Sequence, residues 1–180
     1  MTEPEKTRLS PIEQRFILHW GEMGTRWGVN RTVAQVHALL FISKRPISAE
    51  EIAKTLSVAR SNVSTSLREL QGWRIIRAVP VLGDRRQHFE SVKDVWELFR
   101  TVLQERKKRE LDPTIQVVRE CVDEARRAGP SEAYARQRLE ELLEFITTMD
   151  MLFEEFQHVS PAAARGLAKL RGRIRKLLPG

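Results

Sequence analysis

The stretch that decides the fold begins Ala59-Arg60-Ser61-Asn62-Val63-Ser64-Thr65-Ser66-Leu67-Arg68-Glu69-Leu70 and continues to Gly83-Asp84-Arg85-Arg86-Gln87-His88-Phe89. Its first part has apolar residues at helical spacing, at Val63, Leu67 and Leu70. Its second part is rich in β-branched residues over 75–81, alternates loosely over 87–92, and has turn chemistry over 82–86. We therefore expect a helix from about Arg60 to Gln71, stopped at Gly72, and then a β-hairpin with a basic tip. Pro80 lacks an amide donor, so its strand should lie at the edge of a sheet.

Two helices are expected directly upstream of this stretch. Asn30 can cap the first, which carries Val33, Val36 and Leu40 and stops near Lys44-Arg45-Pro46. The capping box Ser48-Ala49-Glu50-Glu51 opens the second, which ends at a brief turn at Ser57-Val58. The order helix, short capped helix, tight turn, helix and basic hairpin is that of a winged helix-turn-helix. In that motif the third helix enters the DNA major groove and the hairpin lies along the backbone or minor groove.

The face of the third helix opposite its apolar residues is polar and carries no acid. Asn and Arg can bind adenine and guanine edges, while Ser and Thr can bind bases or phosphates. The alternatives are an ordinary amphipathic surface helix and a solvated hairpin turn. We take DNA contact as the working hypothesis, with these candidate residues: Arg60, Ser61, Asn62, Ser64, Thr65, Arg68, Arg85 and Arg86.

The remainder of the chain is expected to be helical. A capping box at Ser10-Pro11-Ile12-Glu13 opens a leading helix whose apolar stripe is Ile12, Phe16, Trp20, Met23 and Trp27. Further helices are expected over about 93–110, from a break at Asp112-Pro113 to Ala128, and after a second break at Gly129-Pro130. The last of these carries a 3-4-3-4-3 seam for another helix, made of Leu139, Leu142, Ile146, Met149, Phe153 and Phe156. A final helix opens at Ser160-Pro161 and carries Ala163, Leu167, Leu170, Ile174 and Leu177.

These elements predict a mostly α (α+β) fold. A winged helix-turn-helix with its leading helix would occupy residues 10–92, and helical dimerisation elements would occupy residues 93–180. The seam and the leading stripe together exceed what one compact chain readily buries, so we expect a homodimer. Its two recognition helices would meet a pseudo-palindromic operator in double-stranded DNA, with half-sites about 34 Å apart.

Composition and charge fit this interpretation. The chain has 180 residues, one cysteine and a formal net charge of +7. A single cysteine excludes an intramolecular disulfide framework, and neither a signal peptide nor a membrane-length apolar run is present. We expect a soluble cytoplasmic protein with no membrane partner. The basic charge is concentrated over 44–92 and after Ser160, whereas 131–159 is acidic, which makes a polyanionic partner plausible.

The sequence resembles the MarR superfamily, and more closely its GbsR-type branch of winged-helix repressors. The similarity is carried by residues 59–70, Trp73, residues 83–89 and Lys93-Asp94-Val95-Trp96. The resemblance implies a homodimeric transcriptional regulator, terminal helices at the dimer interface and often a small-molecule effector. It also implies that Asp84 braces an arginine or shapes the turn. Two positions depart from the pattern: Ala59 replaces a Ser or Thr cap, and Arg74 replaces a glycine.

Other candidate sites have simpler explanations. Trp20 and Trp27 could form an aromatic box for a cationic effector, although aromatics at helical spacing usually belong to a core. Cys121 could sense redox state, but its apolar neighbours favour a structural role. The histidines lack metal-ligand spacing and no catalytic motif is present, so we expect no metal, cofactor or enzymatic activity. The rival functions are a winged-helix protein-interaction module without DNA binding and, less favoured, a helical enzyme.

Overall fold

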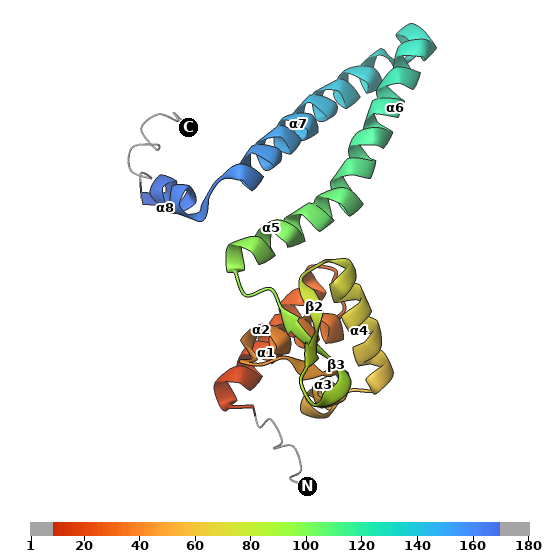
Figure 1. The fold of residues 1–180 in the computed structure, drawn as a ribbon. Helices are drawn as coiled ribbons and strands as arrows, with labels where there is room; N and C mark the ends of the chain where they lie inside the picture. Colours follow the sequence, from red (N-terminus) through yellow and green to blue (C-terminus); the bar gives the residue numbers. More distant parts are fainter. Residues whose placement is uncertain (1–8, 170–180) are drawn as a thin grey trace. The chain divides into compact units, whose positions relative to one another are not determined.

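The computed structural model describes residues 9–169, and the chain divides into two compact units, Met1–Val102 and Leu103–Gly180. Figure 1 labels the elements of both units, which are described separately. The first unit ends ten residues beyond the expected boundary at residue 92, because Leu98 and Val102 pack against its core. The division into DNA-binding and dimerisation functions at that residue stays a prediction.

The first unit opens with two helices, α1 (Pro11–Arg26) and α2 (Arg31–Ile42). Ser10 and Glu13 form the predicted capping box at the start of α1, and the Asn30 side chain caps α2 by accepting from the amide of Thr32. Both helices therefore begin at the residues that the sequence predicts, because a short polar side chain at each N-cap accepts a hydrogen bond from an otherwise unpaired backbone amide.

The face of α1 that packs against α2 differs from the predicted stripe. Ile12 and Trp27 are exposed, whereas Ile17 and Gly21 are buried, with Phe16 and Trp20 half-buried against the core. A Cβ at Gly24 would lie 2.5 Å from the Cβ of Ala34, so the two helices meet along small residues. A hydrophobicity pattern misses such a line, because glycine contributes close approach rather than apolar area.

The next two helices are α3 (Ala49–Leu56) and α4 (Arg60–Gly72). The Ser48 hydroxyl accepts from the amide of Glu51 at the start of α3, and Ser57 turns the chain with a left-handed φ of 54°. The two helices share one core with α2 and the sheet, formed by Leu39, Leu40, Ile52, Val63, Leu67 and Leu70. The predicted apolar face of the third helix is confirmed.

A three-stranded antiparallel sheet completes this unit, in the order β1-β3-β2. Its strands are β1 (Ile47–Ser48), β2 (Ile76–Val81) and β3 (Asp84–Ser91). The edge position of β2 accommodates Pro80, as predicted. Strand β1, which was not predicted, pairs through Ile47 with Phe89 and through Ser48 with His88. Two residues carry too little periodicity to show as a strand.

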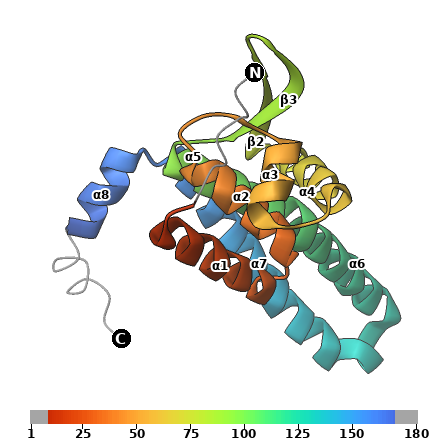
Figure 2. The same cartoon turned by 90° about the horizontal axis from the view of Figure 1, so that it is seen from below.

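The hairpin tip is shorter than expected. Only Leu82 and Gly83 connect β2 to β3, since Val81 pairs with Asp84 and Gly83 takes a φ of 82°. The prediction of Arg85 and Arg86 at the tip was wrong, because both lie within β3. The register shifts between Val79 and Val81, so extra residues of β3 are accommodated opposite Pro80. Figure 2 shows the hairpin extending away from the helices of its unit.

Helix α5 (Val95–Arg106) begins in the first unit, where Asp94 accepts from the amide of Glu97. The π-helical turn η1 (Lys107–Leu111) and helix α6 (Asp112–Ala128) follow without the predicted break at Asp112-Pro113. Proline removes one amide donor and crowds the carbonyl four residues earlier. A wider π turn directly before it accommodates both effects within a continuous helical course.

The second unit is an antiparallel hairpin of α6 and α7 (Ala133–His158), joined by the 3-10 turn η2 (Gly129–Glu132) (Figure 1). Its core contains Ile115, Val118 and Ile146, flanked by Leu111, Leu139 and Leu143. The predicted seam is therefore divided: Leu139 and Ile146 pack inside the hairpin, whereas Leu142 and Met149 are exposed. Helix α8 (Pro161–Lys169) follows, and the expected apolar positions Leu170, Ile174 and Leu177 lie outside the described residues.

The architecture is mostly helical with one small antiparallel sheet, which confirms the predicted fold class. Over the part of the chain that the structure describes, no helix has the length and apolar character needed to cross a membrane.

Candidate nucleic-acid interface

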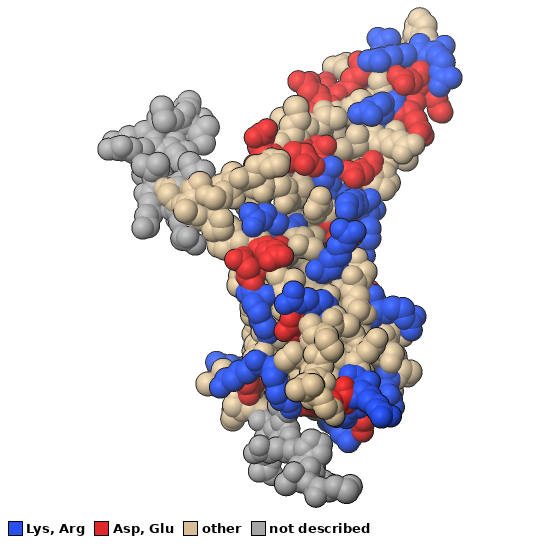
Figure 3. All heavy atoms as spheres, viewed as in Figure 1, with Lys and Arg blue, Asp and Glu red and all other residues tan. Residues whose placement is uncertain are grey.

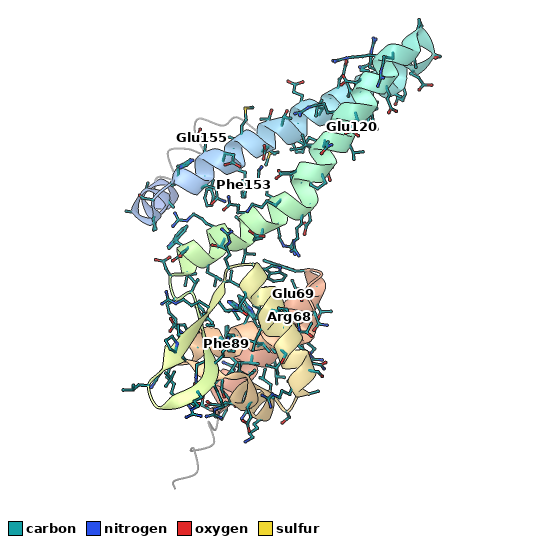
Figure 4. The ribbon with its side chains drawn as sticks, turned by 45° about the vertical axis from the view of Figure 1, so that its right-hand side comes forward. Arg68, Glu69, Phe89, Glu120, Phe153 and Glu155 are labelled. Atoms are coloured by element: carbon teal, nitrogen blue, oxygen red, sulfur yellow. The ribbon has the colours of Figure 1, made fainter. Side chains whose placement is uncertain are left out.

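Helix α4 presents the polar face that the sequence predicts. Val63, Ser66, Leu67 and Leu70 are buried. All six candidate DNA-contact residues on this helix are exposed: Arg60, Ser61, Asn62, Ser64, Thr65 and Arg68. Ser66 is turned inward and donates its hydroxyl to the carbonyl oxygen of Asn62 at 2.8 Å. The exposed side chains therefore form one continuous surface, on which Figure 4 labels Arg68.

Arg68 forms no ion pair within residues 9–169, although Glu69 follows it directly. Figure 4 shows both side chains on α4, with Phe89 on β3. Glu69 is half-buried and Arg68 is exposed. The guanidinium of Arg68 is thus available for a bidentate contact with a planar acceptor pair, such as O6 and N7 of guanine.

Both ends of α4 lack the residues usually found there. Ala59 occupies the N-cap with extended backbone, and no side chain caps the first turn. At the other end Gly72 is the last helical residue, Trp73 is the C-cap, and Arg74 takes a left-handed φ of 57°. The chain turns at Arg74 rather than at Gly72, which corrects the predicted stop.

The hairpin and α3 are joined by a network of charges centred on Arg86. The Arg86 guanidinium donates to Asp84 from Nε at 3.0 Å and from Nη2 at 2.6 Å, as the bracing role of Asp84 predicts. Its Nη1 lies 3.4 Å from Glu50 Oε2, and Glu50 Oε1 lies 3.0 Å from Lys54 Nζ. These hydrogen bonds and charges lower the pKa of Asp84, chiefly through Arg86, and that of Glu50, chiefly through Lys54.

Arg85 differs from Arg86 in its surroundings. It is exposed on β3 and forms no ion pair in the described part of the chain, whereas the neighbouring wing residue Arg77 pairs with Glu90 at 2.6 Å across the hairpin. Figure 3 shows basic side chains interspersed with acidic ones over the visible face of the first unit. Lys54 was not among the predicted site residues. Its spacing of four residues from Glu50 on one helix nevertheless predicts an ion pair between the two side chains.

A buried histidine supports the base of the hairpin. His37 of α2 packs between the rings of Trp20 and Phe41, and its Nε2 lies 3.3 Å from Ser91 Oγ. Burial, assisted by the positive charge of Lys93, lowers the pKa of His37 to about 4. Lys93 donates to the carbonyl oxygens of Leu40, Phe41 and Ser43 and so caps the C-terminus of α2.

The other candidate positions are separate from this surface. The Trp20 ring packs against Phe16, with ring centroids 5.4 Å apart, and against His37, while Trp27 is exposed at the C-cap of α1. Cys121 is a half-buried free thiol on α6. Residues 9–169 contain no group of three or more His, Cys, Asp or Glu side chains that could hold a metal ion.

Comparison with known families identifies the winged-helix segment. The model of the MarR family matches residues 27–87, which span α2, β1, α3, α4, β2 and the start of β3. Comparison with curated proteins gives no match. The observed topology over this segment is that of a winged helix, and the segment is similar to the MarR family.

One solved structure supports the fold, and two others are less similar to the chain. A crystal structure of a transcriptional regulator has a TM-score of 0.59 and 22% identity, covering 82% of this chain and 96% of that chain. A variant of MepR from Staphylococcus aureus, bound to an oligodeoxyribonucleotide, has a TM-score of 0.38 and 15% identity, with coverages of 77% and 92%. A transcriptional regulator from Thermotoga maritima has a TM-score of 0.38 and 14% identity, with coverages of 82% and 92%.

Proposed function

We propose, from the premise that residues 27–87 form a MarR-type winged helix, that the protein is a sequence-specific DNA-binding transcriptional regulator. The main support is the surface of α4, where six polar or basic candidate residues are exposed. No Asp or Glu lies between Arg60 and Arg68. A helix that enters a major groove needs such a surface, because carboxylates there would repel phosphate.

The proposed contacts divide into base reading and phosphate binding. Arg68 reads a base edge, while Asn62, Ser61, Ser64 and Thr65 make further base or phosphate contacts. Arg60 lies in the first turn of α4 and Arg85 and Arg86 lie on the hairpin, so these three residues bind backbone phosphate or the minor groove. The uncapped amides at the start of α4 can add phosphate contacts, since they have no side-chain acceptor.

We propose further that the regulator is a homodimer formed through α7. Four apolar side chains on this helix follow a 3-4-3 spacing and are exposed: Leu142 by 44%, Phe145 by 61%, Met149 by 46% and Leu152 by 58%. A second copy of the same helix can bury them as a seam with coiled-coil geometry. Two winged helices related by a two-fold axis would then bind a pseudo-palindromic operator.

The finer assignments follow from the resemblance of the chain to the GbsR-type branch. We propose a cytoplasmic repressor of nearby genes whose affinity for DNA responds to a small-molecule effector, without a cofactor or catalytic activity. An effector that binds the two states of the dimer unequally would shift it toward the state with lower affinity for DNA. Trp20 and Trp27 stay the candidate effector residues, although Trp20 already packs against two neighbouring rings.

Selection of bound duplexes from a random pool tests this proposal. We expect enrichment of a pseudo-palindrome, which is then compared with a random duplex in titrations of the wild type, Arg68→Ala and Arg86→Ala at several salt concentrations. Removal of a bidentate base contact should weaken the selected site by about 1–3 kcal/mol more than random DNA. Arg86→Ala should weaken both duplexes equally and flatten the salt dependence by roughly one unit of slope for each phosphate that the variant no longer binds.

The outcomes separate the rival functions. Equal weakening on both duplexes for Arg68→Ala would make this residue a phosphate contact. No enrichment of any duplex by the folded wild type would overturn DNA binding and favour a protein-interaction module instead.

A further inference from the structure

Glu50 is shared by two cations on the surface that carries the candidate DNA contacts. Its Oε1 lies 3.0 Å from Lys54 Nζ, one turn along α3, and its Oε2 lies 3.4 Å from Arg86 Nη1 on β3. All three side chains are partly exposed, so each can reach a ligand from solution. Hydrogen bonding to Lys54 and Arg86 lowers the pKa of Glu50, so both contacts favour its charged form.

The charges of this cluster cancel. Arg86 is also held by Asp84 through Nε and Nη2, so the four side chains of Glu50, Lys54, Asp84 and Arg86 carry two positive and two negative charges. In a helix-turn-helix the helix before the recognition helix crosses the DNA backbone, and the wing lies beside it. The cluster joins these two elements, so a phosphate that approaches Arg86 or Lys54 meets a carboxylate that already pairs with the cation.

We propose that Glu50 is a determinant of affinity that lowers binding to every duplex by competing with DNA phosphate for Arg86 and Lys54. This inference rests on the proposed function. A carboxylate acts here in two ways, because it occupies the donors of both cations and repels the incoming phosphate. The effect of Glu50 on affinity is independent of base sequence, because Arg86 and Lys54 would contact the DNA backbone rather than base edges. Arg68 differs in this respect, since it is proposed to contact a base edge.

The test measures the binding of Glu50→Gln to the selected duplex and to a random duplex at salt concentrations between about 50 and 200 mM. Glutamine keeps the size of the side chain and removes its charge. We expect both affinities to rise by about three- to tenfold and by the same factor. The slope of log affinity against log salt concentration should steepen by roughly one unit for each protomer in which Arg86 or Lys54, released from Glu50, binds a phosphate.

Two further variants identify the cause. Glu120→Gln makes the same change of charge on α6, where Glu120 accepts from Gln116 of the same helix, and should leave both affinities unchanged. In an Arg86→Gln background the gain from Glu50→Gln should shrink, because one of the two cations that it releases is absent. Thermal unfolding followed by tryptophan fluorescence verifies that the first unit of the Glu50 and Arg86 variants is folded, since all four tryptophans lie within residues 1–102. For Glu120→Gln, whose substitution lies in the second unit, circular dichroism verifies that the helices are kept.

The results separate this inference from the proposed function. Wild-type protein that binds neither duplex overturns the proposed function. Wild-type protein that binds DNA, together with a Glu50→Gln variant of unchanged or lower affinity, overturns only the role of Glu50. A lower affinity would mean that the contact between Glu50 and Arg86 holds the wing in its binding position.

Discussion

The amide of Ile75 donates to the carbonyl oxygen of Leu70 at 3.2 Å, which closes the turn between α4 and the hairpin. The amide of Arg74 donates to Gln71 inside the same turn, so the two hydrogen bonds form a Schellman motif after Trp73. Leu70 and Ile75 are both buried in the core of the first unit. The turn therefore fixes where the hairpin leaves α4, and it requires a left-handed residue at Arg74.

Replacing Arg74 by glycine should stabilise the first unit. A left-handed conformation costs a residue with a Cβ about 1–2 kcal/mol, and part of this is offset by the greater freedom of glycine in the unfolded chain. We expect Arg74→Gly to gain about 0.5–1 kcal/mol in urea unfolding followed by tryptophan fluorescence. Arg74→Ala controls for removal of the charge and should gain nothing, because it keeps the Cβ. An equal gain from both variants would contradict the role of backbone strain.

Replacing Ala59 by serine should also stabilise the first unit. Ala59 has the extended backbone of an N-cap, with φ of −60° and ψ of 139°, but no side-chain acceptor. A serine hydroxyl there can accept from the amides of the first turn, which is worth about 1 kcal/mol. Ser10→Ala is the reciprocal variant, since it removes the oxygen that accepts from the amide of Glu13, and it should destabilise the fold by a similar amount. Unchanged stability in Ala59→Ser would show that water already satisfies these amides.

The stability of the first unit should fall as pH is lowered from about 6.5 toward 4. Burial lowers the pKa of His37 to about 4 in the folded state, whereas the unfolded value is 6.5. The unfolded chain therefore binds a proton first, and stability present above pH 6.5 is lost through this window, by up to roughly 3 kcal/mol below pH 4.

The variant His37→Phe isolates this contribution. Phenylalanine cannot titrate but keeps an aromatic ring between Trp20 and Phe41. Unfolding free energies measured between pH 5 and 7 should show a shallower slope in this variant than in the wild type. Parallel slopes would show that His37 does not take up the proton.

Substitutions on adjacent residues of α7 should separate dimerisation from folding. Phe145 is 61% exposed, so Phe145→Glu should yield a folded monomer in sedimentation velocity at micromolar concentration. Ile146 is 9% exposed and packs with Ile115 and Val118, so Ile146→Glu should reduce the helical content measured by circular dichroism. A wild-type monomer would contradict the proposed dimer, and a dimeric Phe145→Glu would move the interface elsewhere.

The polar face of α4 was predictable from sequence alone. Helical period assigns every residue of one helix to a face, so Val63, Leu67 and Leu70 on the buried side place Arg68 and its neighbours outside. The caps at Ser10, Asn30 and Ser48 were predictable for a similar reason, since a cap is made by residues two or three positions apart.

Tertiary structure decided the features that depend on residues far apart in sequence. The pairing of Arg86 with Glu50 joins positions 36 residues apart, and only the tertiary structure adds this partner to the local contact between Arg86 and Asp84. The predicted seam on α7 divided because α6 covers Leu139 and Ile146 and leaves Leu142 and Met149 exposed.

The contact between α1 and α2 is another feature that could not be predicted from local sequence. It passes through Gly21 and Gly24, whose lack of side chains matters only beside Gln35 and Ala34 of the second helix. Local sequence thus determined where α1, α2 and α3 begin and which face α4 buries, because hydrogen bonding and periodicity within an element act over a few residues. The partners of each charge and each apolar face were decided by the tertiary structure, because packing brings together side chains whose separation along the chain carries no local signal.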